Sequence, residues 1–278
     1  MSEDDPPFTQ GRARKALGQH FLFDPDILRR TALAAGPVEG RTVIEVGPGP
    51  GGLTRALLNE GAGKVIAVEA DDRFANALET WPEAKDGRLH IHNADARKVD
   101  WPKLVSCAGG TQPAMIIANL PYNVGTPLAV NWLKAGSWRG EMALMFQKEV
   151  AERLVAGPGS PHYGRLAVLA HAVSNPHIAF TLPPGAFKPP PKVDSAVAVL
   201  VPLQPEKQFE DLATLEKVAA AAFGQRRKML RASLKSLAKT KGIDATEWLE
   251  NCGIDPTARA ETLLQIQFRA LATAFADA

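Results

Sequence analysis

The chain has 278 residues, of which 45% are apolar and 22% are charged, and this is the composition of an ordinary globular protein. It excludes a disordered chain and a fibrous repeat, and the length suggests one large domain or two unequal ones. The formal net charge of +2 gives no argument for a nucleic-acid partner, so such an argument must rest on how the charges are distributed.

Neither a membrane span nor an exported protein is indicated. The longest apolar run, 196–201, is much too short to cross a bilayer. The acidic N-terminal sequence lacks the apolar segment of a secretory signal. Two cysteines, Cys107 and Cys252, form neither a metal-binding spacing nor a disulfide framework. We therefore expect a reduced, cytoplasmic protein without a metal, and since nothing suggests an obligate dimer we expect a monomer.

The first two thirds of the chain alternate short β-rich runs with helical segments. Helices are predicted after several of these runs, and the predicted strands are 41–47, 63–71, 87–95, 114–122 and 141–147. This alternation is typical of a parallel sheet covered by helices. Two more β-rich runs, 177–182 and 195–201, are joined by a proline-rich segment, which predicts a hairpin at the edge of the sheet.

The last third carries only helical patterns. Beyond Pro205, apolar residues spaced by three and four predict helices over 212–238 and 261–276. We therefore expect an α/β protein in which residues 1–205 form a Rossmann-like domain with a ligand crevice, and residues 206–278 form a smaller all-helical domain.

A glycine-rich loop follows the first predicted strand. Gly47, Gly49 and Gly52 match the G-x-G-x-x-G pattern, and Glu69 ends the next strand. Glycines here let the backbone approach a ligand closely, and the carboxylate can accept hydrogen bonds from ribose hydroxyls. NAD and S-adenosylmethionine both carry an adenosine ribose, so the loop alone does not choose between them.

Three further residues favour S-adenosylmethionine. Glu45 stands two residues before the first glycine, where a carboxylate can fix the loop and face a cationic ligand but would repel a pyrophosphate. Asp95 ends the third strand and can accept a hydrogen bond from an adenine amine, and Asn119 ends the fourth. Successive strand ends around one crevice are where an open α/β sheet binds ligands.

The segment 119–122 has the chemistry needed to methylate an aromatic amine. The side-chain oxygen of Asn119 and the carbonyl of Leu120 can hold the two amine hydrogens, and Pro121 fixes the turn that aims them. Tyr122 can stack on a base that has left its helix, and Phe187 can close over the opposite face. The alternatives are that Tyr122 is an ordinary buried aromatic residue and that Phe187 anchors its loop.

A basic segment lies in the predicted helical domain. Residues 223–242 contain seven Lys or Arg and no acidic residue. In one continuous helix, basic residues would recur at four-residue steps beside an apolar stripe of leucines, and the basic face could meet RNA phosphates. The alternative is an ordinary solvated face. The candidate RNA-binding residues are Arg226, Arg227, Lys228, Arg231 and Lys235.

Several of these motifs together resemble one known family. The stretches "ALGQHFLFD", "VIEVGPGPGGLT", "NLPYNVGTPL", "FKPPPKVDSAVAVL" and "AFGQRRKMLRASLK" are similar, in this order, to motifs of the ribosomal RNA small-subunit adenine dimethyltransferase family. The resemblance covers nearly the whole chain. It implies a class I methyltransferase sheet with a C-terminal helical domain, and S-adenosylmethionine contacts at His20, Leu22, Gly47, Glu69, Asp95 and Asn119. His20 departs from the Asn that many members have.

The resemblance also implies an activity. The family dimethylates the exocyclic amines of two adjacent adenosines in a hairpin loop near the 3′ end of 16S rRNA, within an immature small ribosomal subunit. One alternative is a 23S rRNA adenine methyltransferase of the resistance type. Another is a ribosome-assembly or nucleic-acid-binding factor that has the fold without the catalysis. An NAD enzyme is a more distant alternative.

Overall fold

The computed structural model describes residues 19–121 and 124–278, and these form two compact units. The first unit has two segments, the chain up to Ala151 and His177–Val201. The second consists of Glu152–Pro176 and Pro202–Ala278. This division differs from the boundary predicted at residue 205. The reason is that α8 (Arg165–Val173) packs with the C-terminal helices, and the amide of Leu203 donates to the carbonyl of Val173 at 3.0 Å.

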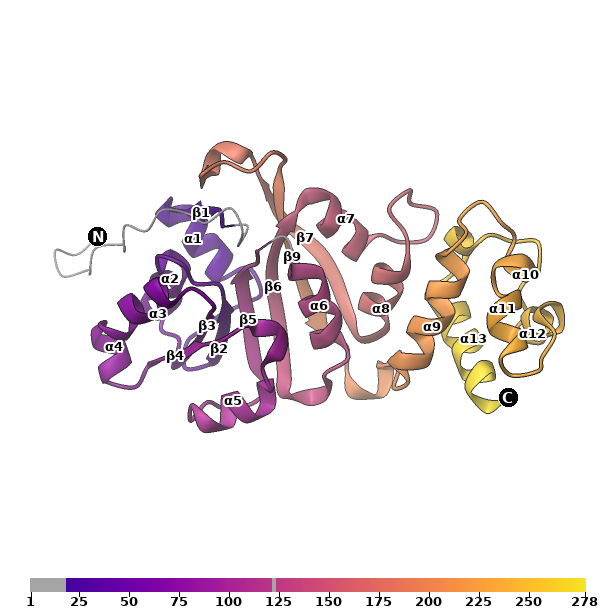
Figure 1. Ribbon diagram of the computed structural model, residues 1–278, viewed down its shortest axis with the longest axis horizontal. Helices are drawn as coiled ribbons and strands as arrows, with labels where there is room; N and C mark the ends of the chain where they lie inside the picture. The colour runs from indigo at the N-terminus through magenta and orange to yellow at the C-terminus, as the bar shows by residue number, and fades with distance from the viewer. Residues whose placement is uncertain (1–18, 122–123) are drawn as a thin grey trace. The chain divides into compact units, whose positions relative to one another are not determined.

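A seven-stranded mixed sheet forms the centre of the first unit (Figure 1). Its order is β4 (Leu89–Asn93), β3 (Lys64–Glu69), β2 (Thr42–Val46), β5 (Ala114–Asn119), β6 (Arg139–Gln147), β9 (Ser195–Pro202) and β7 (Ser174–Leu182). The strands from β4 to β6 pair in parallel, and β9 pairs antiparallel with β6. The predicted strands and the hairpin at the sheet edge are confirmed.

Two very short strands were not predicted. β1 (Phe21–Leu22) and β8 (Phe187–Lys188) form an antiparallel pair in which Leu22 lies opposite Phe187. β8 lies inside the proline-rich segment that joins β7 to β9. Each strand has only two residues, which is too short for a periodic sequence pattern to reveal.

Helices cover the sheet of the first unit. They are α1 (Pro25–Ala32), α2 (Gly52–Asn59), α3 (Asp72–Glu79), α4 (Pro82–Lys85), α5 (Trp101–Cys107) and α6 (Gly125–Leu133). Aspartates begin several of them, as at Asp24, whose side chain accepts hydrogen bonds from two backbone amides of the first turn of α1. α7 (Lys148–Val155) follows β6.

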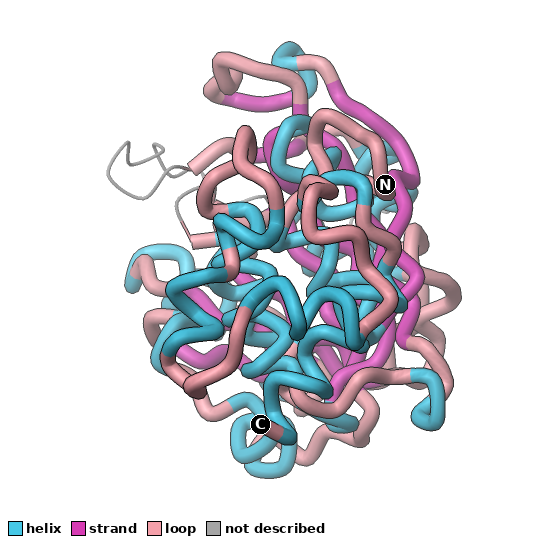
Figure 2. Tube along the Cα trace, turned by 90° about the vertical axis from the view of Figure 1, so that its right-hand side faces the viewer, coloured by secondary structure: helices cyan, strands magenta, loops and turns pink. Residues whose placement is uncertain are grey.

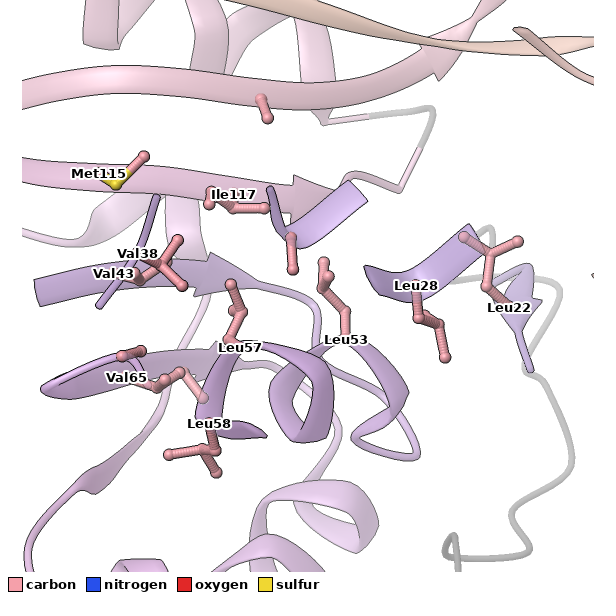
Figure 3. Close-up of a cluster of buried hydrophobic side chains, with 14 of the residues drawn as sticks. Leu22, Leu28, Val38, Val43, Leu53, Leu57, Leu58, Val65, Met115 and Ile117 are labelled. Atoms are coloured by element: carbon pink, nitrogen blue, oxygen red, sulfur yellow. The ribbon is translucent and has the colours of Figure 1, made fainter. Parts of the chain in front are cut away.

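The hydrophobic core shows why the sheet is buried. Successive strand residues point to opposite faces, so β2 places Val43 on one face and Ile44 on the other, and both are fully buried. On the Val43 face, side chains from the strands meet those of α1 and α2 (Figure 3). The labelled members of this cluster are Leu22, Leu28, Val38, Val43, Leu53, Leu57, Leu58, Val65, Met115 and Ile117.

Helices and loops make up the described residues after Pro202 (Figure 2). The helices are α9 (Leu212–Phe223), α10 (Leu230–Ser233), α11 (Lys235–Lys239), α12 (Ala245–Asn251) and α13 (Gln265–Asp277). The rings of Tyr163, Phe223 and Phe268 pack together in this unit, with centroids 5.5 to 6.4 Å apart. Across the described part of the chain, every helix is too short or too polar to cross a membrane.

The long helix predicted over 212–238 is wrong. α9 ends at Phe223, a non-helical segment occupies 224–229, and two short helices follow. Gly224 follows the last helical residue, and the amide of Leu230 donates to the carbonyl of Ala258 at 2.8 Å rather than continuing α9. The basic residues therefore do not form one stripe at four-residue steps.

Candidate active site

A cavity of about 200 Å³ lies where the parallel strands β2, β3, β4 and β5 end. The carboxyl ends of parallel strands are where an open α/β sheet binds ligands. The cavity is lined by Gln19, His20, Phe21, Val46, Gly47, Gly49, Val68, Glu69, Ala70, Ala94, Asp95, Ala96, Arg97, Asn119, Leu120, Pro121 and Val124. All of these residues belong to the first unit.

The glycine loop between β2 and α2 is tightly enclosed. Gly47, Gly49 and Gly51 have φ values of +71°, +52° and +87°, a region that favours glycine. A Cβ atom at Gly49 would lie 2.6 Å from the ring of Phe21, so there is no room for a side chain. Gly47 and Gly49 both line the cavity, so the backbone of this loop forms part of its wall.

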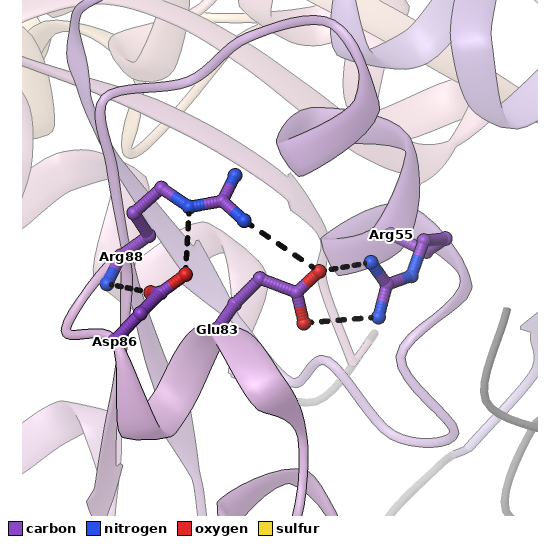
Figure 4. Close-up of polar contacts among 4 residues, drawn as sticks. All are labelled: Arg55, Glu83, Asp86 and Arg88. Carbon is purple, nitrogen blue, oxygen red and sulfur yellow. Dashed lines mark hydrogen bonds and ion pairs between the residues drawn. The ribbon is translucent and has the colours of Figure 1, made fainter. Parts of the chain in front are cut away.

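A network outside the cavity supports this loop (Figure 4). The Arg55 guanidinium makes a two-pronged ion pair with Glu83 at 2.5 and 3.2 Å, and Arg88 lies 3.8 Å from the same carboxylate. Arg55 also lies 4.3 Å above the ring of Trp81, and a Cβ at Gly51 would lie 2.7 Å from that ring. The ion pair thus holds the ring against the loop.

The side chain of Glu69 links the glycine loop to the segment that follows β3, at the cavity wall. Its carboxylate accepts hydrogen bonds from the amides of Gly49, at 3.0 Å, and Asp71, at 2.8 Å. Burial raises the pKa of the Glu69 carboxyl, and these backbone hydrogen bonds oppose the rise. A carboxylate has about four acceptor positions, so it retains capacity for ribose hydroxyls.

Glu45 lies behind the loop and does not line the cavity. It is 1% exposed, and Oγ1 of Thr54 in the first turn of α2 donates to its Oε2 at 2.6 Å. The expectation that it fixes the loop agrees with this contact, whereas the expectation that it faces the ligand does not. β2 residues alternate between the two sheet faces, and Glu45 points with Val43 toward α2. Burial raises the pKa of Glu45 to about 8.

This raised pKa predicts how stability depends on pH. Between the ordinary pKa of 4.5 and about 8, the folded state keeps a proton on Glu45 that the unfolded state releases. The free energy of unfolding should therefore fall as pH rises through this window, by at most about 1.4 kcal/mol per pH unit. Glu45→Gln cannot ionise, so urea unfolding from pH 5 to 8 should show the variant losing less stability than the wild type. Parallel pH profiles for the two proteins would contradict this assignment.

Asp95 follows β4 and lines the cavity. Its carboxylate begins the short 3₁₀ turn η2 (Ala96–Lys98) by accepting from the amide of Arg97 at 3.0 Å. The Arg97 side chain pairs with the same carboxylate, and Nη2 lies 2.6 Å from Oδ2. These hydrogen bonds lower the pKa of Asp95 to about 2, so it is ionised at neutral pH.

Asn119 lies at the end of β5, and its side-chain amide is oriented by His20, which directly precedes β1. Nδ2 donates to the carbonyl of His20 at 2.9 Å, which leaves Oδ1 as a hydrogen-bond acceptor. Leu120 is buried, and the ring of Pro121 lies 3.5 Å from where a Cβ on Gly47 would be. Tyr122, the predicted stacking residue, lies outside the described residues.

Leu22 and Phe187 lie in the core instead of the cavity wall. Their side chains are 6% and 2% exposed and belong to the hydrophobic cluster on the Val43 face. Alternation along β1 points Phe21 toward the cavity and Leu22 away from it, and Phe187 pairs with Leu22 and so shares its side. The prediction that Phe187 closes over a base does not agree with this arrangement. Phe187 anchors its loop, which was the alternative.

His20 and two unpredicted residues complete this side of the cavity. Nδ1 of His20 is 2.8 Å from the carbonyl of Pro189, so the ring contacts the proline-rich segment while the residue lines the cavity. Phe21 packs edge-on against Phe74, with centroids 5.5 Å apart. Arg97 was missed because it belongs to no motif that the sequence analysis recognised. Phe21 lies inside the stretch "ALGQHFLFD", but only His20 and Leu22 of that stretch were assigned to the cofactor.

The candidate RNA-binding residues lie in the second unit on different local structures. Arg227 and Lys228 are exposed in the turns after α9, and Arg231 and Lys235 are exposed on α10 and α11. The Arg226 guanidinium instead donates to the carbonyls of Pro161 and Tyr163, at 2.8 and 3.0 Å. This residue therefore stabilises its own unit as well as carrying charge.

Comparison with known proteins gives consistent matches over nearly the whole chain. The family described as "Ribosomal RNA adenine dimethylase" matches residues 10–277. "Ribosomal RNA small subunit methyltransferase A" of Agrobacterium fabrum is 52% identical over 263 residues, which cover 94% of this chain and 92% of that protein. The protein of the same name from Maricaulis maris is 47% identical over 264 residues, with 95% and 90% covered.

Solved structures share the fold. A dimethyladenosine transferase from Plasmodium falciparum superposes with a TM-score of 0.77 at 25% identity, covering 93% of this chain and 98% of that one. The 23S rRNA methyltransferase ErmE superposes with a TM-score of 0.67 at 24% identity, covering 92% and 99%, which shows a common fold. The predicted class I methyltransferase sheet with a C-terminal helical region is confirmed.

Proposed function

The chain belongs to the ribosomal RNA adenine dimethylase family, and from this membership we propose that it dimethylates two adjacent adenosines near the 3′ end of 16S rRNA. It is an S-adenosylmethionine-dependent methyltransferase that acts on ribosomal RNA. The proposed target is the exocyclic amine of each adenosine, in the hairpin loop of an immature small (30S) subunit. We expect the enzyme to act as a monomer in the cytoplasm.

One observation carries the proposal at the level of chemistry. Asn119, Leu120 and Pro121 line the same cavity as Glu69 and Asp95, so acceptors for an amine lie beside acceptors for an adenosine. Relatives that are 47% to 52% identical are named for the small subunit, whereas the 23S methyltransferase shares the fold at lower identity. Neither the 23S target nor a non-catalytic or NAD-dependent role is favoured.

The residues of the cavity fit S-adenosylmethionine. The backbone of Gly47 and Gly49 forms part of the cavity wall, and Glu69 and Asp95 provide carboxylates for ribose hydroxyls and an adenine amine. His20 and Leu22 would contribute through the β1 segment, with Leu22 restricted to its backbone because its side chain is in the core. When bound, the cofactor supplies an electrophilic methyl group on a sulfonium.

The proposed work of Asn119 and Leu120 is to prepare the amine. The nitrogen of adenine donates its lone pair to the ring and is a poor nucleophile while it stays planar. Oδ1 of Asn119 and the carbonyl of Leu120 would accept hydrogen bonds from the two N–H groups of this amine and hold its lone pair toward the methyl group. Positive charge grows on this nitrogen during transfer, and preorganised oxygens stabilise it. Stacking by Tyr122 remains a prediction of the sequence.

The exposed basic residues would hold the RNA backbone. Contacts to phosphates release counterions, so log K should fall linearly with log salt concentration. Arg227→Gln and Lys228→Gln should each make this negative slope shallower by about 0.7 to 0.9 for small-subunit RNA, because each removes about one phosphate contact. Filter binding at several salt concentrations measures this slope. Lys217→Gln, an exposed charge on α9 outside the basic segment, is the control and should leave it unchanged.

Nucleoside mass spectrometry tests the proposed activity. Small subunits that lack the two methylated adenosines should be incubated with the enzyme and S-adenosylmethionine, and their 16S rRNA should then be digested. Dimethyladenosine at two adjacent positions is the expected product. Incorporation into large subunits only, or none into small subunits, would refute the proposed substrate.

A further inference from the structure

We infer that Arg97 is a positioning residue that orients the Asp95 carboxylate toward the adenine amine, and so gives the cavity its preference for a 6-amino purine. This inference rests on the proposed role of Asp95 as the acceptor of that amine. Arg97 belongs to no binding motif in the sequence, yet both residues line the cavity.

The contacts between the two residues fix the plane of the carboxylate. Oδ1 of Asp95 accepts from the amide and from Nε of Arg97, both at 3.0 Å. Oδ2 accepts from Nη2 at 2.6 Å, with Nε at 3.2 Å. A guanidinium that binds both carboxylate oxygens adds directional specificity to the ion pair, and the backbone amide ties the same group to the start of η2.

This arrangement leaves an acceptor position for a ligand. A carboxylate has about four lone-pair sites, and three N–H groups of Arg97 contact it: the amide at Oδ1, Nη2 at Oδ2, and Nε, whose single hydrogen is shared between Oδ1 and the more distant Oδ2. An adenine amine can therefore bind Oδ2 without displacing Arg97. A 6-oxo purine would present an oxygen to an ionised carboxylate instead, and the two acceptors would repel each other.

The expected size of the effect is modest. The Arg97 side chain is 59% exposed and that of Asp95 is 30% exposed, so solvent screens the pair. Loss of the fork should therefore weaken binding by about two- to fivefold, the range that exposed ion pairs give. Removal of the carboxylate itself should cost more, because the amine then loses its charged acceptor.

Titration calorimetry with two probes tests the inference. S-adenosylhomocysteine carries the 6-amino group, and S-inosylhomocysteine carries a 6-oxo group in its place. Arg97→Met should weaken binding of the adenosyl probe about two- to fivefold and should not weaken binding of the inosyl probe, so the ratio of the two affinities falls. Lys98→Met removes an exposed charge next along the chain, one that makes only a longer-range interaction with Asp95, and is the matched control that should leave the ratio unchanged.

The other outcomes would overturn it. Equal affinities of wild type and Arg97→Met for the adenosyl probe would mean that Arg97 does not position the carboxylate, and tighter binding of the adenosyl probe by the variant would mean that Arg97 competes with the ligand. Equal weakening of both probes would show a general disturbance of the loop. Asp95→Asn separates the two levels: if it leaves the ratio unchanged, the assignment of Asp95 to the adenine is wrong as well.

Discussion

Replacing Asn119 with alanine is expected to slow methyl transfer to rRNA by about 10² to 10³-fold. The substitution removes Oδ1, one of the two acceptors proposed to hold the amine, and a preorganised group of this kind contributes about this factor in other enzymes. Binding of S-adenosylhomocysteine should change much less, because Asn119 is only one part of the cavity wall. Single-turnover transfer to under-methylated small subunits measures the rate, and calorimetry measures the binding.

A second asparagine provides the control. Asn93 ends β4, the strand at the sheet edge, and does not line the cavity. Its side-chain amide donates a hydrogen bond to Asp72 at 3.0 Å. Asn93→Ala should therefore leave the transfer rate close to that of the wild type. A rate for Asn119→Ala within about threefold of wild type would remove this residue from the proposed chemistry.

Gly49→Ala is expected to weaken binding of S-adenosylhomocysteine by at least about tenfold. Alanine is strained at φ +52°, by about 1 kcal/mol or more, and its Cβ would lie 2.6 Å from the Phe21 ring. That ring is held against Phe74, so the loop or the cavity wall must move. A loss of about 1.4 kcal/mol corresponds to tenfold in affinity. Calorimetry gives the affinity, and urea unfolding gives the stability.

Backbone strain and side-chain overlap can be separated. Gly40 has a φ of +68°, and a Cβ there would meet no atom within 4 Å. Gly40→Ala should therefore lose stability through strain alone and keep its affinity for the ligand. The combination Gly49→Ala with Phe21→Ala should recover part of the binding. If Gly49→Ala does not affect binding at all, the proposal that the glycine loop contacts the ligand is contradicted.

The fold was largely predictable because its strands carry strong local patterns. The strands are fully buried at positions such as Ile44, Ile66 and Ile116, so their sequences are short apolar runs bounded by polar residues and glycines. The predicted long helix failed because the spacing of Leu230 and Leu234 continues the helical period across Gly224. Periodicity records which residues are buried, and both leucines are, but it does not show that the chain between them stays helical.

The candidate site was predictable where a residue follows a strand directly. Glu69, Asp95 and Asn119 each lie at a strand end or directly after one, and parallel strands bring their ends to one edge of the sheet. Phe187 could not be placed in this way, because its direction depends on its pairing with Leu22, which is distant in sequence. The same pairing directs Phe21 to the cavity, and the stretch "ALGQHFLFD" that contains it does not show which of its side chains face the ligand.

A crystal structure with bound S-adenosylhomocysteine is the most direct test of the account. We expect the ribose hydroxyls at Glu69, the adenine amine at Asp95, and the sulfur atom facing Asn119, all within the cavity described here. A ligand bound elsewhere, or bound here with its sulfur directed away from Asn119, would contradict the proposal that this cavity brings the methyl donor to a target amine.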